Sequence, residues 1–140
     1  MLCNMRFRVP VAFIAVVLVF HGLGLWRLYE IFHWYDMPMH FAGGMAMALL
    51  AWATWDMFVR DVKFTVRHPA AKRVAFMLWL VGFTAIIGIG WEWFEFGFDR
   101  FVLPTLQGWT PAQASIADTM ADFFFDLSGA VVVSLFRRKV

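Results

Sequence analysis

The chain has 140 residues, of which 62% are hydrophobic and only 16% are charged. Soluble domains average about 45–50% apolar and about 25% charged residues, so the composition excludes an ordinary soluble domain and predicts an integral membrane protein. The formal net charge is +2, and the basic residues are distributed as membrane topology requires, which argues against a nucleic-acid-binding surface.

Four stretches are long and apolar enough to cross a bilayer, at residues 9–29, 37–59, 74–98 and 116–136. Each meets the requirement of about 20 residues for a hydrocarbon core about 30 Å thick. Basic residues precede the first stretch, as in a signal peptide, but no small-residue cleavage signature follows, so we interpret it as a retained anchor helix. The sequence therefore predicts an all-α polytopic membrane protein, with residues 1–140 forming one domain of four transmembrane helices.

The basic residues predict the orientation of these helices. Ten of the twelve Lys and Arg residues lie in the N-terminal tail, in the segment 60–73 or at the C-terminus. By the positive-inside rule these three segments are cytoplasmic, which places both termini inside. Only Arg27 and Arg100 are predicted on the outer side.

The second predicted helix begins with a polar pair and continues with small residues. Asp36 and His40 are four residues apart and therefore share a helix face. Small side chains allow the backbone of a neighbouring helix to approach closely. We expect such packing at Ala42, Gly43, Gly44, Ala46 and Ala48.

The third and fourth predicted helices add acidic residues at the same depth, in the outer half of the bilayer. They are Glu92 and Glu95, three apart, and Asp118, Asp122 and Asp126, each four apart. His21 of the first helix lies near this depth. A lone carboxylate facing lipid costs about 2.5–3.5 kcal/mol even on the lenient insertion scale. We therefore expect these side chains to face inward and to form one cluster.

A divalent metal ion would supply the positive charge that such a cluster lacks. Like charges this close cannot all stay ionised, and Arg27 and Arg100 lie near helix ends. Carboxylates with imidazole suit Zn, Mn, Fe or Mg, and helix pairs with these spacings build metal sites in bundle cores. The predicted metal ligands are His40, Glu92 and Asp122, with Asp118 and Asp126 as further candidates. Glu95 or Asp36 would be the general base that activates a metal-bound water.

Each of these residues also has a structural interpretation. Asp118 completes a capping box with Ser115 at the helix N-cap, and Asp36 can cap the second helix in the same way. Glu95 can reach the interface or pair with Arg100. Asp126 can link helices by hydrogen bonding, and His21 can be a packing residue. The weakest structural explanations belong to Glu92, His40 and Asp122.

Three motifs resemble the signatures of the YjdF-like bacterial inner-membrane proteins: Y-D-M-P-M-H-F at 35–41, W-E-W-F-E-F at 91–96 and D-T-M-A-D at 118–122. The pattern is more distantly similar to the VanZ-like family. The resemblance covers about residues 35–130, and its polar positions match the candidates selected above by depth. It implies a small helical bundle in the bacterial cytoplasmic membrane, and it supplies no reaction.

Three functions follow from these residues. In the first, the metal site acts on a lipid or lipid-linked envelope substrate that enters from the outer leaflet. In the second, the acids form a protonatable relay for a proton- or cation-linked transporter or accessory subunit. In the third, the protein is a membrane scaffold whose acids only join helices and cap their ends. Because four short helices are few for enclosing a cavity, a homodimer is compatible with each of them.

Overall fold

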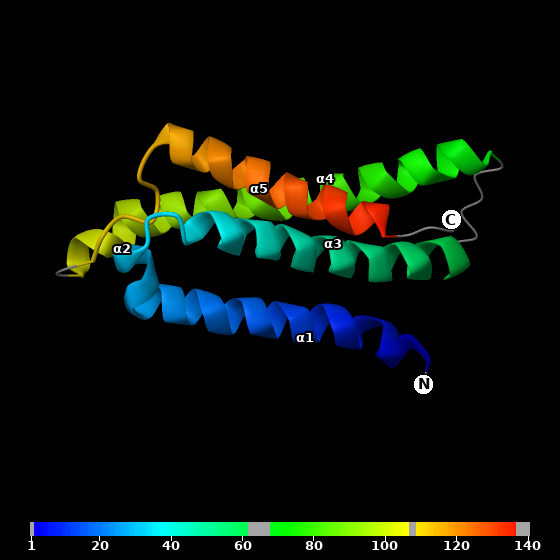
Figure 1. Cartoon of the computed structure of the whole chain (residues 1–140), viewed down its shortest axis with the longest axis horizontal. Helices are drawn as coiled ribbons and strands as arrows, with labels where there is room; N and C mark the ends of the chain where they lie inside the picture. The colour runs from blue at the N-terminus through cyan, green and yellow to red at the C-terminus, as the bar shows by residue number, and fades with distance from the viewer. Residues whose placement is uncertain (1, 62–67, 107–108, 137–140) are drawn as a thin grey trace.

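The computed structural model describes residues 2–61, 68–106 and 109–136, and all regular secondary structure in these ranges is helical (Figure 1). The first helix, α1, spans Leu2–Leu23 and continues without a break into a π-helical segment, η1, and a short helix, α2. These two segments span Gly24–Leu28 and Tyr29–Ile31.

The remaining helices follow the predicted stretches closely. α3 spans Asp36–Asp61, α4 spans Pro69–Gly97 and α5 spans Ile116–Leu135. Beyond α4 the chain stays helical through η2, Phe98–Val102, and η3, Leu103–Thr105. The prediction of an all-α fold is confirmed for the described residues.

Within the described residues, three helical stretches are long and apolar enough to cross a membrane. They are Arg6–Ile31, Asp36–Val59 and Pro69–Thr105. The fourth, α5, has 20 residues but carries three aspartates, and its crossing of the membrane stays a prediction. Large apolar side chains are exposed along the helices, as expected of a lipid-facing surface; examples are Val19, Leu78, Ile86, Trp93 and Phe124.

The helices lie side by side, and the described chain begins and ends at the same end of the bundle (Figure 1). This arrangement agrees with termini on one side of a membrane. Residues 62–67 and 137–140, which carry part of the basic charge behind the orientation prediction, lie outside the described residues.

α3 is the central helix, because it packs against α1, α4 and α5. Its approach to α5 is so close that glycines are required. A Cβ atom added at Gly44 would fall 2.7 Å from the Cα atom of Asp126, and one added at Gly129 would fall 2.8 Å from the backbone nitrogen of Met45. The small residues of α3 thus provide the close packing predicted for them.

The interior of the bundle is divided along its length. Near the chain ends it is an apolar core of small and aromatic residues: Ala48, Ala51, Trp55, Phe76, Leu80, Ala130 and Val133. In the other half the buried side chains include His40, Glu92, Asp122 and Asp126. The predicted gathering of polar residues in one half of the bundle is therefore observed.

Candidate metal centre

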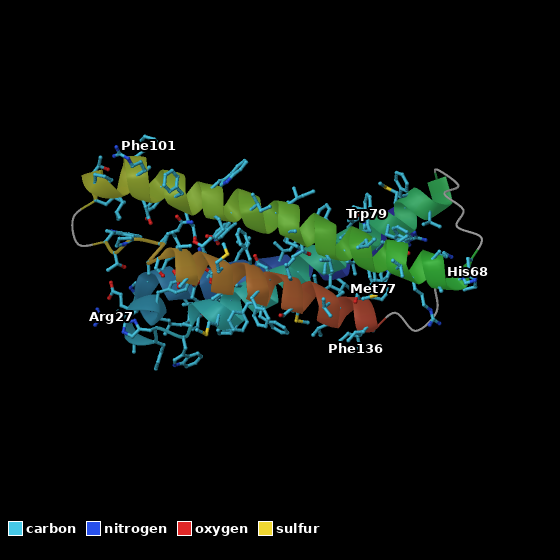
Figure 2. The ribbon with its side chains drawn as sticks, turned by 90° about the horizontal axis from the view of Figure 1, so that it is seen from above. Arg27, His68, Met77, Trp79, Phe101 and Phe136 are labelled. Carbon is cyan, nitrogen blue, oxygen red and sulfur yellow. The ribbon has the colours of Figure 1, made fainter. Side chains whose placement is uncertain are left out.

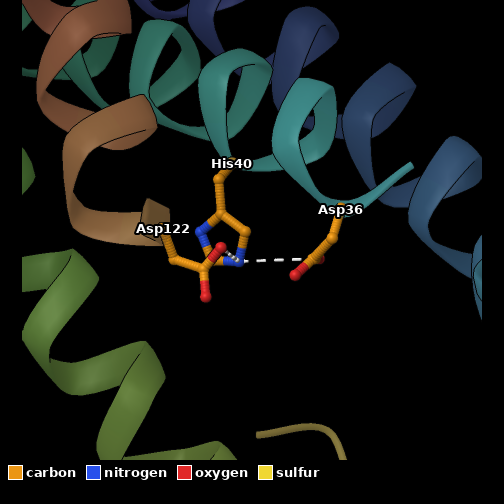
Figure 3. A group of neighbouring side chains, drawn as sticks. All are labelled: Asp36, His40 and Asp122. Atoms are coloured by element: carbon orange, nitrogen blue, oxygen red, sulfur yellow. Dashed lines mark ion pairs between the residues drawn. The ribbon is translucent and has the colours of Figure 1, made fainter. Parts of the chain in front are cut away.

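His40 lies at the centre of the buried polar half. It projects from the first turns of α3 toward Asp36 of the same helix and Asp122 of α5 (Figure 3). Its Nε2 atom is 3.7 Å from Oδ1 of Asp36 and 3.7 Å from Oδ1 of Asp122. Its Nδ1 atom is 3.4 Å from Oδ1 of Asp126. Carboxylates therefore face both ring nitrogens.

The two Nε2 distances have the size expected of atoms that share a metal ion. A distance of 3.7 Å is too long for a hydrogen bond between nitrogen and oxygen. Ligand atoms about 2.0–2.2 Å from a tetrahedral ion lie about 3.4 Å from one another. One ligand atom from each of Asp36, His40 and Asp122 lies within 4.8 Å of the other two. A small inward movement of the three side chains would complete such a site.

Asp126 completes the geometry from the other side of the ring. Metal-bound histidines almost always donate their second ring N–H to a carboxylate, a carbonyl or water, which fixes the tautomer and the ring orientation. Asp126 is buried where three helices meet. A Cβ atom at Gly88 of α4 would fall 2.7 Å from its Oδ2 atom, so the missing side chain at Gly88 makes room for the carboxylate.

Glu92 and Glu95 diverge, although they are only one helical turn apart on α4. Glu92 is buried, and its Oε2 atom accepts a 2.9 Å hydrogen bond from Nε2 of Gln113. Glu95 accepts a 2.7 Å hydrogen bond from the indole nitrogen of Trp91, whose ring packs against His21 of α1. Both interact electrostatically with the carboxyl group of Asp36, yet neither belongs to the group formed by Asp36, His40 and Asp122.

Asp118 has the geometry of a helix cap. Its backbone nitrogen donates to Oγ of Ser115 at 3.1 Å, and its own Oδ2 accepts from the backbone nitrogen of Ala114 at 3.1 Å. Ser115 is the N-cap of α5. The two bonds form a variant of the capping box, in which the side chain of Asp118 accepts from the backbone nitrogen of Ala114 and not from that of the N-cap residue Ser115.

His21 is engaged away from the candidate ligands. Its Nδ1 atom and the Tyr29 hydroxyl are 2.8 Å apart, and its ring meets that of Trp91 edge to face at 5.4 Å. Arg27 and Arg100, the two cations predicted on the outer side, are exposed, and neither forms an ion pair with these acids in the described part of the chain.

Asp99 and Gln113 are polar residues that the sequence analysis did not select. The carboxylate of Asp99 accepts hydrogen bonds from the backbone nitrogens of Ala112 and Gln113, each at 2.9 Å. This clamp holds the segment before α5 so that Gln113 reaches Glu92. Asp99 follows Glu92 by seven residues and shares its helical face, a spacing that could have indicated it. Gln113 lies in an irregular segment with no periodic signal.

These observations define a class: a helical membrane protein with a buried cluster of one histidine and several carboxylates. The chain belongs to the family described as "Predicted membrane protein (DUF2238)", which matches residues 3–140. It is also similar to an uncharacterized protein of Thermotoga maritima, with 27% identity over 115 residues. That match covers 81% of this chain and 53% of the relative, so the chain spans about half the length of the curated relative it matches. No solved structure matches the chain.

Proposed function

We propose that the cluster binds one divalent metal ion through Asp36, Nε2 of His40 and Asp122. The observation that carries this proposal is the placement of the His40 ring. Two carboxylate oxygens lie 3.7 Å from Nε2, close to the distance between two ligand atoms of one ion, and a third carboxylate lies at Nδ1. Carboxylate and imidazole ligands suit Zn, Mn, Fe or Mg. The sequence also suggested Glu92, Asp118 and Asp126 as ligands. In this proposal they lie near the ion without coordinating it.

Three protein ligands leave coordination positions open, which is the arrangement of a catalytic site. A water molecule bound there would be activated toward hydrolysis. Glu95 then remains the candidate general base, because Asp36 is used as a ligand and Glu95 interacts electrostatically with His40. The substrate would be a lipid or lipid-linked envelope precursor, whose polar group can reach the cluster from the bilayer.

The proposal places the protein in a bacterial cytoplasmic membrane, with α5 as a fourth span and both termini inside. The support is the distribution of Lys and Arg and the position of the described chain ends at one end of the bundle. The likeness to YjdF-like proteins, and the more distant one to VanZ-like proteins, stays a prediction.

The test is metal content by mass spectrometry on detergent-purified protein, comparing the wild type with His40→Ala and His21→Ala. We expect about one equivalent of a single metal in the wild type and in His21→Ala, and none in His40→Ala. His21→Ala is the matched control because it removes an imidazole of the same half of the bundle that bonds to Tyr29. Absence of metal from folded wild type after reconstitution with Zn, Mn, Fe and Mg would contradict the proposal.

A second candidate function is proton storage or transfer without a metal. It is favoured by the same ring, since an imidazole with carboxylates at both nitrogens can pass a proton from Asp36 or Asp122 toward Asp126. In the described residues, however, the buried cluster of the other half is apolar, so a path across the membrane would need water or a partner. Metal-free wild type that takes up protons cooperatively would support this alternative.

A further inference from the structure

A cavity of about 390 Å³ lies between α4 and the start of α5. This volume falls within the range of about 300–1,000 Å³ typical of small-molecule sites. Figure 2 shows α4 and its extension η2 running from His68 to Phe101, alongside α5, which ends near Phe136. The cavity is lined by Glu92, Trp93, Phe96, Gln113, Ile116, Thr119 and Phe123.

The walls of this cavity are amphipathic. The apolar side is formed by Trp93, Phe96, Ile116 and Phe123. Two of these side chains are widely exposed, Trp93 at 74% and Ile116 at 83%. With α5 as the proposed fourth span, these exposed side chains face the lipid, and a ligand can enter the cavity sideways from the bilayer. A ligand entering there must be apolar along most of its length.

Glu92, which lines the cavity, carries an unmet hydrogen-bond acceptor. Glu92 is only 4% exposed, and its Oε2 atom is occupied by Gln113. Its Oε1 atom is buried and has no hydrogen-bond partner among the described residues. Leaving a buried carboxylate oxygen unpaired costs at least about 1–3 kcal/mol, so an N–H or O–H donor supplied by a ligand would remove a real penalty.

Gln113 cannot turn to meet that oxygen. Its side-chain nitrogen already donates to Oε2 and to the backbone oxygen of Glu92, at 2.9 and 3.1 Å. Its backbone is held by Asp99. The donor must therefore come from outside the described chain. None of the described residues that line the cavity is basic, so the site selects a cationic donor over an anionic head group.

We propose that this cavity binds a membrane amphiphile whose polar end carries a primary ammonium group, with the N–H groups donated to Glu92 and the chain lying along Trp93, Phe96 and Ile116. Glu92 also interacts electrostatically with Asp122 of the candidate metal centre. A cationic head group at Glu92 would therefore interact electrostatically with that centre. This inference rests on the proposed function only in taking the amphiphile to be the substrate; binding itself requires no metal.

The test uses protein reconstituted in nanodiscs of phosphatidylcholine mixed with either phosphatidylethanolamine or phosphatidylglycerol. Lipids that remain bound after transfer to detergent are counted by native mass spectrometry. Phosphatidylethanolamine should be retained in preference to both others, because phosphatidylcholine has a cation without N–H groups and phosphatidylglycerol is anionic. Glu92→Gln should reduce this preference about 10-fold, the effect of losing one charge-assisted hydrogen bond.

Two further variants separate binding from folding. Ile116→Trp fills the cavity from an exposed position at the first residue of α5 and should abolish retention. Val19→Trp is the matched control, because it adds the same side chain to a wholly apolar groove on α1 lined by Ala15, Val16, Val19 and Phe20. This control should retain the lipid as the wild type does.

The outcomes are distinct. Equal retention of the three lipids, or an intact preference in folded Glu92→Gln, would overturn the inference. Full competition by soluble ethanolamine would also overturn it, since the ligand would then be a small amine and not an amphiphile. Retention of phosphatidylethanolamine by His40→Ala, which should lack metal, would support the cavity even where the proposed metal site fails.

Discussion

The contact between α3 and α5 can be tested by adding a single methyl group at Gly44. The new Cβ atom would lie 2.7 Å from both the Cα and the carbonyl carbon of Asp126, and still closer to its carbonyl oxygen. Ordinary contact begins at 3.4 Å, so the helices must separate locally by about 0.7 Å or more. Backbone atoms cannot rotate away as a flexible side chain would.

The expected cost follows from comparison with Gly90→Ala. A Cβ atom at Gly90 of α4 has no atom within 4 Å. Both substitutions gain the helix propensity of alanine, about 1 kcal/mol in water, so this gain cancels in the comparison. What remains is the cost of overpacking, about 1–3 kcal/mol. Gly44→Ala should therefore be less stable than Gly90→Ala by that amount.

The assay is unfolding in mixed micelles of dodecyl maltoside and SDS, followed by circular dichroism, with metal content measured on the same samples. Because the displaced backbone belongs to Asp126, Gly44→Ala should also weaken metal binding, whereas Gly90→Ala should not. Equal stability of the two variants would show that α3 and α5 do not meet at Gly44, and the geometry of the whole cluster would then be wrong.

Three further predictions concern single carboxylates, and a fourth concerns the effect of pH. Asp126→Asn keeps the size of the side chain but removes the charge facing Nδ1 of His40, and should weaken metal binding about 10–100-fold in a competition titration. Asp118→Asn should leave the metal affinity unchanged and lower stability by no more than about 1 kcal/mol, because Asp118 caps α5; a loss of metal there would make it a ligand. Asp99→Ala should release Gln113, seen as faster amide hydrogen exchange in residues 112–114 and weaker lipid retention, and unchanged exchange would contradict the clamp. Metal affinity should fall as pH is lowered, because protons compete for the ligands; an affinity independent of pH would exclude carboxylate and imidazole ligation.

The sequence predicts the long helices well because hydrophobic length is a strong signal. The bounds differ most where helices extend beyond the apolar stretch. α1 begins at Leu2 and not at residue 9, although Pro10 lies inside it. η1 and η2 carry α1 and α4 onward as π-helix. π-Helical turns have no periodic signature in a single sequence, so these extensions could not be read from it.

The cluster is predictable in part because some of its members share one helix. The pairing of Asp36 with His40 follows from their spacing of four residues. The choice of Asp122 and Asp126 over Asp118 does not, since it depends on where α5 crosses α3. That crossing is set by Gly44 and Gly129. A single sequence shows that small residues are present, but it does not show which of them pack against each other.

The divergence of Glu92 and Glu95 has a geometric cause that the sequence contains only implicitly. Three residues on an α-helix turn through about 300°, which leaves the two side chains about 60° apart when viewed down the axis. That angle is enough for Gln113, in the segment before α5, to bond to Glu92 while Trp91 bonds to Glu95. Sharing a face predicts proximity to the same cluster, but it does not predict the same partners.

Charge balance links the metal and proton interpretations of the cluster. All three ion pairs found among its described residues involve His40, so one imidazole faces three carboxylates. Even a protonated ring would leave an excess of negative charge, which a low-dielectric interior does not tolerate. The balance must come from protons on the carboxyl groups or from a cation between them.

Binding a metal ion therefore means displacing protons, and the same residues that hold the ion would hold protons in its absence. A pH-dependent response alone cannot separate the two functions. The distinction depends on whether His40→Ala removes a metal ion or only a proton.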